Sequence, residues 1–278
     1  MAGASIALIG IDGAGKTSLM GPLRDALTQR GFTVAEVNWQ NALRTTGPDY
    51  PGISLEQLHV EAWRLFFADG VADGRKIDQE IPRDYSEFTT SGVLESLAGT
   101  PQGARQSGLV GSALVEFAVD YLLQAEFVRP AMAEGKVTLS DGFGFKNVTK
   151  VLKLAGEMPQ SVRSIPRESL DVLVGAVRAA YASPFLQPTL GILLDADPAL
   201  TYDWRTRQAG GPGFGEDYSV TGRSDRDSYV ELQTYMAEQY RSAAAEWGWQ
   251  VVPVDGRPQR ETISEARRIV LEHPAFQV

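Results

Sequence analysis

An octapeptide near the start of the chain reads Gly10-Ile11-Asp12-Gly13-Ala14-Gly15-Lys16-Thr17. It matches the spacing G-x-x-x-x-G-K-[ST], and it stands between a short apolar run, residues 5–9, and a segment with apolar residues at helical spacing. Glycines let backbone N–H groups turn around a phosphate without a Cβ in the way, and a helix N-terminus adds partial positive charge. The motif therefore predicts a nucleotide-phosphate site, with Lys16 on the β and γ phosphates and the Thr17 hydroxyl on Mg²⁺.

The pattern around this loop predicts an α/β fold with a parallel sheet, because strand and helix signals alternate along the chain. Besides residues 5–9, apolar runs predict strands at residues 32–39, 136–140, 189–194 and 250–254. Helices are predicted for the segment that ends at Gly31 and for residues 55–68, 109–133, 147–157, 168–181, 225–247 and 260–272. No internal repeat or second domain boundary is visible, so we expect one domain over residues 1–278.

Two segments lack this periodicity. Residues 69–108 are spaced by glycines and mixed charges, which predicts an insert or a mobile segment beside the site. Residues 208–224 are rich in glycine and aperiodic, which predicts a loop.

Composition excludes several classes of function. The 278 residues are 43% hydrophobic and 22% charged, with a formal net charge of -9, as in ordinary globular enzymes. Cysteine is absent and the histidines are His59 and His273, which excludes thiolate catalysis and a cysteine- or histidine-rich metal centre. The acidic balance argues against a nucleic-acid polymer or an anionic membrane as partner. Without a long uninterrupted apolar run or a leader-like start, we expect a cytoplasmic protein.

The loop and several later segments carry a family resemblance. Residues 10–18, Gly10 to Ser18, resemble the loop of thymidylate kinase, which has an acidic residue at the position of Asp12. The resemblance continues in Phe117-Ala118-Val119-Asp120, Arg129-Pro130-Ala131, Gly135-Lys136, Ser140-Asp141 and Leu193-Leu194-Asp195-Ala196-Asp197-Pro198. It implies a P-loop three-layer sandwich, with a five-stranded parallel sheet in the order 2-3-1-4-5, flanking helices and a lid at residues 208–224.

The resemblance also implies roles for individual residues. ATP, or GTP in its place, would be held by Gly10, Asp12, Gly13, Ala14, Gly15, Lys16, Thr17 and Ser18. Asp141, at the end of a predicted strand, would join Thr17 at Mg²⁺, and Asp12 or Asp141 would orient the acceptor hydroxyl or accept its proton. Arg205, Arg223 and Arg226 bracket the glycine-rich residues 208–222 of the lid and would bring guanidinium groups to the transferred phosphoryl group.

Three positions depart from the family pattern at the acceptor. Gly142, the segment Asn38-Trp39-Gln40-Asn41 and Tyr121 stand where the family has arginines of the acceptor site. A phosphate on the acceptor needs charge-assisted donors to offset its desolvation, so these departures favour an acceptor without a phosphate. Arg44, Arg64 or Lys146 are alternative phosphate ligands from nearby positions.

Aromatic residues are candidates for stacking on a flat acceptor. We consider Trp39, Phe67, Tyr121 and Phe143 as acceptor-binding residues, although aromatic residues at helical spacing are more often core. His59 and His273 are interpreted as non-catalytic, because phosphoryl transfer through a loose transition state needs little base strength.

The resulting hypothesis is an ATP- and Mg²⁺-dependent kinase, similar to thymidylate kinase, of a small nucleoside- or nucleotide-like acceptor. The alternatives are a kinase of a non-nucleotide hydroxyl, such as a modifying or resistance phosphotransferase, a true monophosphate kinase with relocated phosphate ligands, and a nucleotide-gated binding or switch protein. The resemblance also suggests a homodimer through helices near Phe117.

Overall fold

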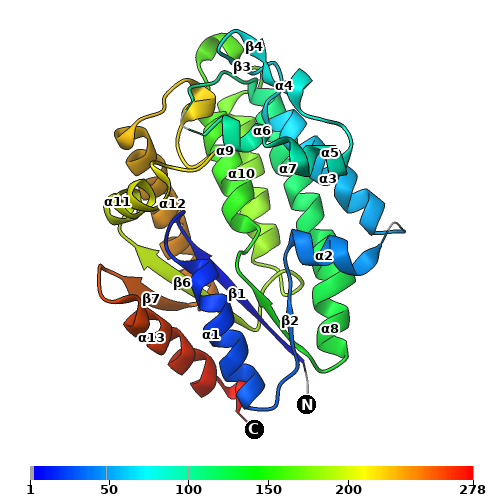
Figure 1. Cartoon of the computed structure of the whole chain (residues 1–278), viewed down its shortest axis with the longest axis vertical. Helices are drawn as coiled ribbons and strands as arrows, with labels where there is room; N and C mark the ends of the chain where they lie inside the picture. The colour runs from blue at the N-terminus through cyan, green and yellow to red at the C-terminus, as the bar shows by residue number, and fades with distance from the viewer. Residues whose placement is uncertain (1–2, 48, 99, 278) are drawn as a thin grey trace.

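The computed structural model describes residues 3–47, 49–98 and 100–277. The predicted domain, residues 1–278, and the predicted insert, residues 69–108, include residues 1–2, 48, 99 and 278, which lie outside the described part. Figure 1 shows the chain as a sheet with helices packed around it and with both termini at the same end of the molecule.

Five parallel strands form the central sheet. They are β1 (Ala4–Gly10), β2 (Val34–Glu36), β5 (Val137–Ser140), β6 (Leu190–Ala196) and β7 (Gln250–Val254). Their spatial order is β2-β5-β1-β6-β7, which becomes 2-3-1-4-5 when these five strands are counted along the chain. The predicted α/β class and five-stranded parallel sheet are confirmed.

Strand β1 fixes the position of the loop that follows it. All seven of its residues are buried, as expected for a strand covered on both faces. Its neighbours are β5, paired at Ala4 with Val137, and β6, paired at Gly10 with Leu194. The chain order reverses at β1, and ligands of open α/β sheets bind outside the carboxyl ends of the strands at such a reversal. Gly10, the last residue of β1, therefore delivers the loop to that edge.

Apart from α11, for which no bounds were predicted, the larger helices begin and end close to the predicted positions. They are α1 (Lys16–Gln29), α3 (Gly52–Phe66), α7 (Gln106–Leu123), α9 (Phe145–Gly156), α10 (Arg167–Tyr181), α11 (Pro198–Ala209), α12 (Arg226–Trp247) and α13 (Gln259–Glu272). In Figure 1, α1 and α13 pack together in front of the sheet, and α12 packs against β6 and β1. Helix α7 packs between α3 and α9, and α10 packs on α9, which builds a helical layer beside the carboxyl edge.

Helix α7 continues through a π-helical turn, η1 (Gln124–Val128), into α8 (Arg129–Ala133). By length and composition alone this run, Gln106–Ala133, is long and apolar enough to cross a membrane, although no such span is predicted from the sequence. In the structure it is the central helix of the helical layer, and 39% of its most apolar window is buried.

The second strand is shorter than predicted. Residues 32–39 were expected to be extended, but β2 ends at Glu36 and Trp39 begins a helix, α2 (Trp39–Thr46). The reason is local, because the Asn38 side chain accepts a hydrogen bond from the backbone N–H of Asn41 at 2.8 Å and caps the helix.

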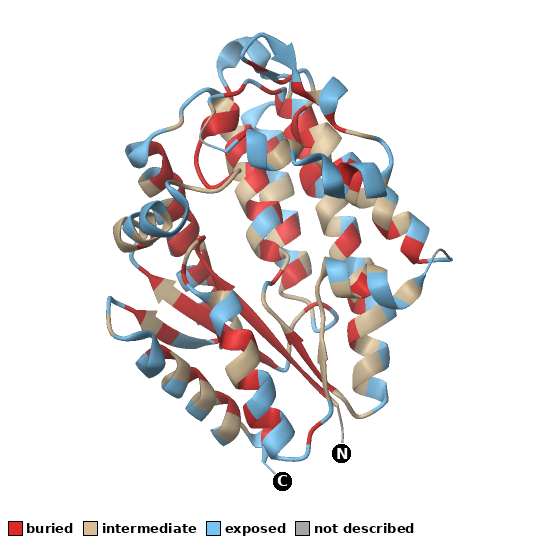
Figure 2. Cartoon of the chain, viewed as in Figure 1, coloured by how far each residue is buried: buried red, intermediate tan, exposed pale blue. Residues whose placement is uncertain are grey.

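The predicted insert has regular structure. It contains the hairpin strands β3 (Val71–Ala72) and β4 (Arg75–Lys76) and three short helices, α4 (Ile77–Glu80), α5 (Tyr85–Ser91) and α6 (Val93–Ser96). The exposed hairpin stands at the top of Figure 2, in which the strands of the central sheet are mostly buried. Phe88 and Leu97 are buried, so these side chains pack the segment onto the core. The mixed apolar and charged sequence of the segment did not indicate them.

The glycine-rich segment at residues 208–224 is irregular, as predicted, apart from its first two residues, which end α11, and one short turn, η3 (Ser219–Thr221). Its second half is nevertheless part of the core, since Tyr218 and Val220 have no exposed surface. The backbone N–H of Gln102 also bonds to the Ser219 carbonyl at 2.7 Å. The predicted lid therefore cannot include the whole of residues 208–224, and for residues 208–214, which are exposed or half-buried, it stays a prediction. Two further short turns are η2 (Gln160–Val162) and η4 (Pro274–Phe276).

Candidate active site

The loop between β1 and α1 has the backbone shape that its glycines allow. Gly13 and Gly15 have φ angles of 81° and 89°, in the left-handed region that disfavours side chains. Gly15 is the N-cap of α1, and no described side chain caps that helix. The amides of the first turn are therefore presented to the space above the loop, where an anion is favoured.

The Lys16 side chain folds over this loop, toward the end of β1. Its ammonium group donates to the carbonyl oxygens of Gly10 and Ile11, both at 2.9 Å. Desolvation of the ammonium group, followed by repulsion from Lys146, lowers the pKa of Lys16 to about 7. A positive charge that is poorly compensated in this way is suited to an anionic ligand.

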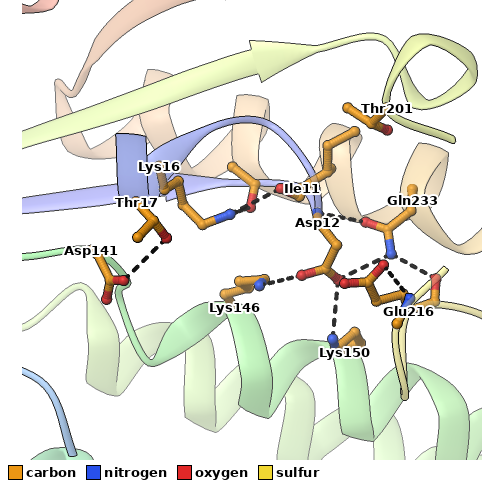
Figure 3. Close-up of polar contacts among 12 residues, drawn as sticks. Ile11, Asp12, Lys16, Thr17, Asp141, Lys146, Lys150, Thr201, Glu216 and Gln233 are labelled. Carbon is orange, nitrogen blue, oxygen red and sulfur yellow. Dashed lines mark hydrogen bonds and ion pairs between the residues drawn. The ribbon is translucent and has the colours of Figure 1, made fainter. Parts of the chain in front are cut away.

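Asp12 points away from the loop into a ring of partners (Figure 3). Its carboxylate pairs with Lys146 at 2.5 Å and with Lys150 at 3.2 Å, and it accepts a bond from the Gln233 amide at 3.1 Å. Desolvation acts to raise the pKa of this carboxyl, but Lys146, Lys150 and Lys16 outweigh it and hold the pKa well below its usual range. The predicted role of Asp12 as proton acceptor is therefore corrected, because its oxygens are occupied and its pKa is low.

Thr17 and Asp141 meet at the other side of the loop. The Thr17 hydroxyl donates to Oδ2 of Asp141 at 3.4 Å, so the structure brings together the two residues predicted for Mg²⁺. Among the described residues no group of three or more His, Cys, Asp or Glu forms a protein-only metal site. Mg²⁺ is commonly held by one or two protein oxygens together with phosphates and waters, so this hydroxyl–carboxylate pair fits the ion.

One cavity of about 830 Å³ joins the loop to the helical layer. The loop side is lined by Asp12, Gly13, Ala14, Gly15, Lys16, Thr17 and Ser18. Gly10 does not line the cavity and contributes instead the carbonyl that Lys16 contacts. We call the opposite side the acceptor half. Its lining residues come from the segment Val37 to Trp39 after β2, from α7 and η1, from β5, α9 and the turn between them, and from the end of α10 to Pro188.

The acceptor half is acidic. Glu116 and Asp120 line it from α7, and Asp120 accepts a hydrogen bond from the Tyr181 hydroxyl. Desolvation raises the pKa of Glu116 to about 7. Desolvation, with a further contribution from Glu116, raises the pKa of Asp120 to about 8. Among the described lining residues of this half there is no arginine, and its lysine, Lys146, is paired with Asp12.

The arginines around residues 208–224 are not equally placed. Arg205 lines the cavity beside the loop, where its side chain approaches Gly13, and its guanidinium is paired with Glu216. Arg223 pairs with Glu231 and lies over the Tyr218 ring, and Arg226 lies over the Tyr202 ring. Neither Arg223 nor Arg226 lines the cavity, so the structure places only Arg205 of the predicted catalytic arginines at the site.

The aromatic candidates divide in the same way. Trp39 and Phe143 line the cavity. Phe67 has no exposed surface and packs against Trp63 and Phe214, so it belongs to the core.

Tyr121 stacks on Phe185 with ring centroids 5.5 Å apart and does not line the cavity. The prediction that Phe67 and Tyr121 bind the acceptor is therefore corrected. His59 lies among Trp39, Tyr85 and Phe88, away from the cavity lining, and desolvation lowers its pKa to about 4.

The sequence analysis missed several residues of the site. Lys150, Gln233 and Glu116 were not assigned a role, although Lys146 and Lys150, like Glu116 and Asp120, stand four residues apart on helices. That spacing places both members of each pair on one helix face and was the available signal. Nothing in the sequence indicated Gln233. This residue lies on α12, and its side-chain oxygen also accepts a hydrogen bond from the backbone N–H of Asp12 at 3.1 Å.

Comparisons with known proteins assign no family to the chain, so the function is argued from the geometry of the site. No protein-family model matches the chain, and no curated protein matches it significantly.

Proposed function

We propose that the chain is an ATP- and Mg²⁺-dependent phosphotransferase that transfers the γ-phosphoryl group to a hydroxyl of a small acceptor without a phosphate. The observation that carries the proposal is that the loop, with Lys16 and Thr17, and the acidic acceptor half line one and the same cavity. The sheet order and the position of the loop at the end of β1 support a P-loop kinase fold, as the resemblance to thymidylate kinase implies.

The chemistry assigns one event to each part of the cavity. The acceptor oxygen forms a bond to the γ phosphorus as the bond from that phosphorus to the β–γ bridging oxygen breaks, and ADP leaves with the electron pair. The hydroxyl proton passes to the Asp141 carboxylate, since Asp12 is occupied by lysines. Lys16, the loop amides and Arg205 neutralise the charge on the transferred group. Thr17 and Asp141 would hold Mg²⁺, which would neutralise part of the charge on the phosphates.

The acceptor half favours a neutral or cationic acceptor. A phosphate monoester would place two negative charges beside Glu116 and Asp120, with no arginine among the described residues that line the acceptor half to compensate; Arg205 and Arg257 line other parts of the cavity. A hydroxyl compound that carries a protonated amine would instead give these carboxyls the cation that they lack, and Trp39 and Phe143 provide apolar surface for a ring. The same lining disfavours the alternative of a true monophosphate kinase.

A direct test compares acceptors that differ in charge. ADP formation from Mg–ATP is measured with amino-hydroxyl compounds such as amino sugars and amino nucleosides, with their neutral counterparts, and with nucleoside monophosphates. The proposal predicts turnover with the first or second group and little with the third. Turnover with monophosphates alone would contradict it, and ATP binding without transfer to any acceptor would favour a binding or switch protein.

Substitutions locate the acceptor half in the same assay. Glu116→Gln is expected to raise the KM of an amine-bearing acceptor by ~10-fold, because a charge-assisted contact becomes a neutral one, and to leave the KM of ATP unchanged. Glu134→Gln is the matched control, since Glu134 pairs with Lys136 outside the cavity lining. Equal effects of the two substitutions would remove Glu116 from acceptor binding.

A further inference from the structure

We propose that Lys146 is a second phosphate-binding cation of this site, in contact with the γ-phosphoryl group, and that Asp12 is the residue that positions it. The inference rests on the proposed function and deepens it. It assigns a role to a cation that comes from the helical layer, whereas the phosphate loop itself supplies Lys16.

The first argument is position. Lys146 is the second residue of α9 and lines the cavity together with Lys16, Thr17 and Asp141. A group transferred from the loop to the acceptor half must pass the boundary between them. Lys146 comes from the acceptor side of that boundary and bonds to Asp12 on the loop side. Figure 3 shows its side chain directed from α9 toward the loop.

The second argument is charge. Three ammonium groups, those of Lys16, Lys146 and Lys150, act on the single carboxylate of Asp12. The side chains of Lys146 and Lys150 are 17% and 13% exposed, so water screens their repulsion only partly. Lys146 and Lys150 both oppose protonation of Lys16, and an added anion would relieve this repulsion.

The third argument is the difference between Lys146 and the other cations. Lys150 bonds to Asp12 but does not line the cavity. Arg223 and Arg226 are also absent from the lining. Arg205 and Arg257 line the cavity, but Arg205 is paired with Glu216, and Arg257 is paired with Asp255 and Glu265. Lys146 therefore lines the cavity and can leave Asp12 for a phosphate. The Asp12 carboxylate would still be bound by Lys150 and by the Gln233 amide.

Asp12 is fixed from four directions. Its backbone N–H donates to Gln233 at 3.1 Å, its carbonyl accepts from the Tyr229 hydroxyl at 2.9 Å, and its carboxylate holds Lys146 and Lys150. A carboxylate anchored in this way fixes the position of the Lys146 ammonium group relative to the loop, and it does not itself contact the reacting atoms. We therefore assign Asp12 a positioning role.

The test needs no acceptor, because a γ-phosphate contact separates ATP from ADP. Calorimetry measures the affinities of Mg–ATP and Mg–ADP for wild type, Lys146→Met and Lys153→Met. Lys153 is the matched control, since it lies on the same helix but pairs with Glu157 and does not line the cavity. Lys146→Met is expected to weaken ATP binding ~10- to 100-fold and ADP binding less than ~3-fold. Lys153→Met is expected to change neither.

A double-mutant cycle tests the role of Asp12. In the wild-type background, Asp12→Asn should reduce the preference for ATP over ADP. In the Lys146→Met background the same substitution should cause no further reduction, because Asp12 acts by positioning Lys146. Additive effects would overturn the positioning role. Thermal melting checks folding, and Lys146→Gln replaces Lys146→Met if the latter is unfolded.

The outcomes separate the two proposals. If Lys146→Met weakens ATP and ADP equally, or neither, the γ-phosphate contact is wrong while the proposed function stands. If wild type binds no nucleoside triphosphate, the proposed function fails and this inference fails with it.

Discussion

The Thr17 hydroxyl and Oδ2 of Asp141 lie 3.4 Å apart, which joins the first turn of α1 to the end of β5. The two residues are separated by more than a hundred positions in the chain, and the parallel pairing of β1 with β5 brings them to one edge of the sheet. This edge is where a metal-bound triphosphate is expected.

Magnesium dependence tests this pair. Asp141→Asn and Thr17→Ala each remove an oxygen ligand of the expected kind, so we predict that both reduce the enhancement of ATP affinity by Mg²⁺ by ~10-fold or more. Their affinity for ATP in the presence of a chelator should stay near that of wild type. Thr28→Ala is the control, because Thr28 lies on the same helix, its hydroxyl donates to the Arg24 carbonyl, and it does not line the cavity. An unchanged magnesium effect in both variants would exclude the pair as ligands.

The lowered pKa of Lys16 predicts a pH dependence of nucleotide binding. In the free protein Lys16 loses its proton above a pKa of about 7, whereas a bound triphosphate favours the charged form. Binding above that pH must therefore take up a proton, and the affinity for Mg–ATP should fall as the pH rises from about 7 to about 9. Calorimetry in buffers of different ionisation enthalpy measures the proton uptake. Lys16→Arg stays charged, so it should show none; equal uptake by this variant would contradict the assignment.

Asp120 predicts a pH dependence of stability. Its pKa in the folded protein, about 8, lies above the value near 4 of an unfolded chain, so the folded state binds more protons between these values. The contribution of Asp120 to stability is therefore fully present below pH ~4 and is lost as the pH rises toward 8. Denaturant unfolding of Asp120→Asn should show a flatter decline from pH ~5 to ~8 than wild type. Parallel curves for the two proteins would show that Asp120 titrates normally.

The sequence predicted the sheet and the loop between β1 and α1 because both depend on local patterns. The apolar run before Gly10 and the helical spacing after Thr17 are contiguous, and the structure has β1 and α1 at these positions. The five strands needed only their apolar character to be recognised. By contrast, α2 was missed because a single cap, Asn38, turns the chain from strand to helix just where Trp39 suggested that the strand continues.

The candidate site was predictable only in part. The roles of Asp12 and Lys146 depend on contacts between the loop and α9, and no local pattern states which carboxylate faces which lysine. Phe67 and Phe143 look equally apolar in the sequence, but packing against Phe214 takes the first into the core and leaves the second on the cavity wall. The buried half of the segment at residues 208–224 was missed for a similar reason, because Tyr218 and Val220 show no helix or strand period.

Calorimetric titration of the whole chain with Mg–ATP and Mg–GTP, beside the Lys16→Ala variant, tests the central claim most directly. The account predicts saturable binding of at least one nucleotide to wild type and a loss of ~10-fold or more in Lys16→Ala, because the charge on the β and γ phosphates loses its partner. Absence of binding to wild type, or equal binding to both proteins, would contradict it.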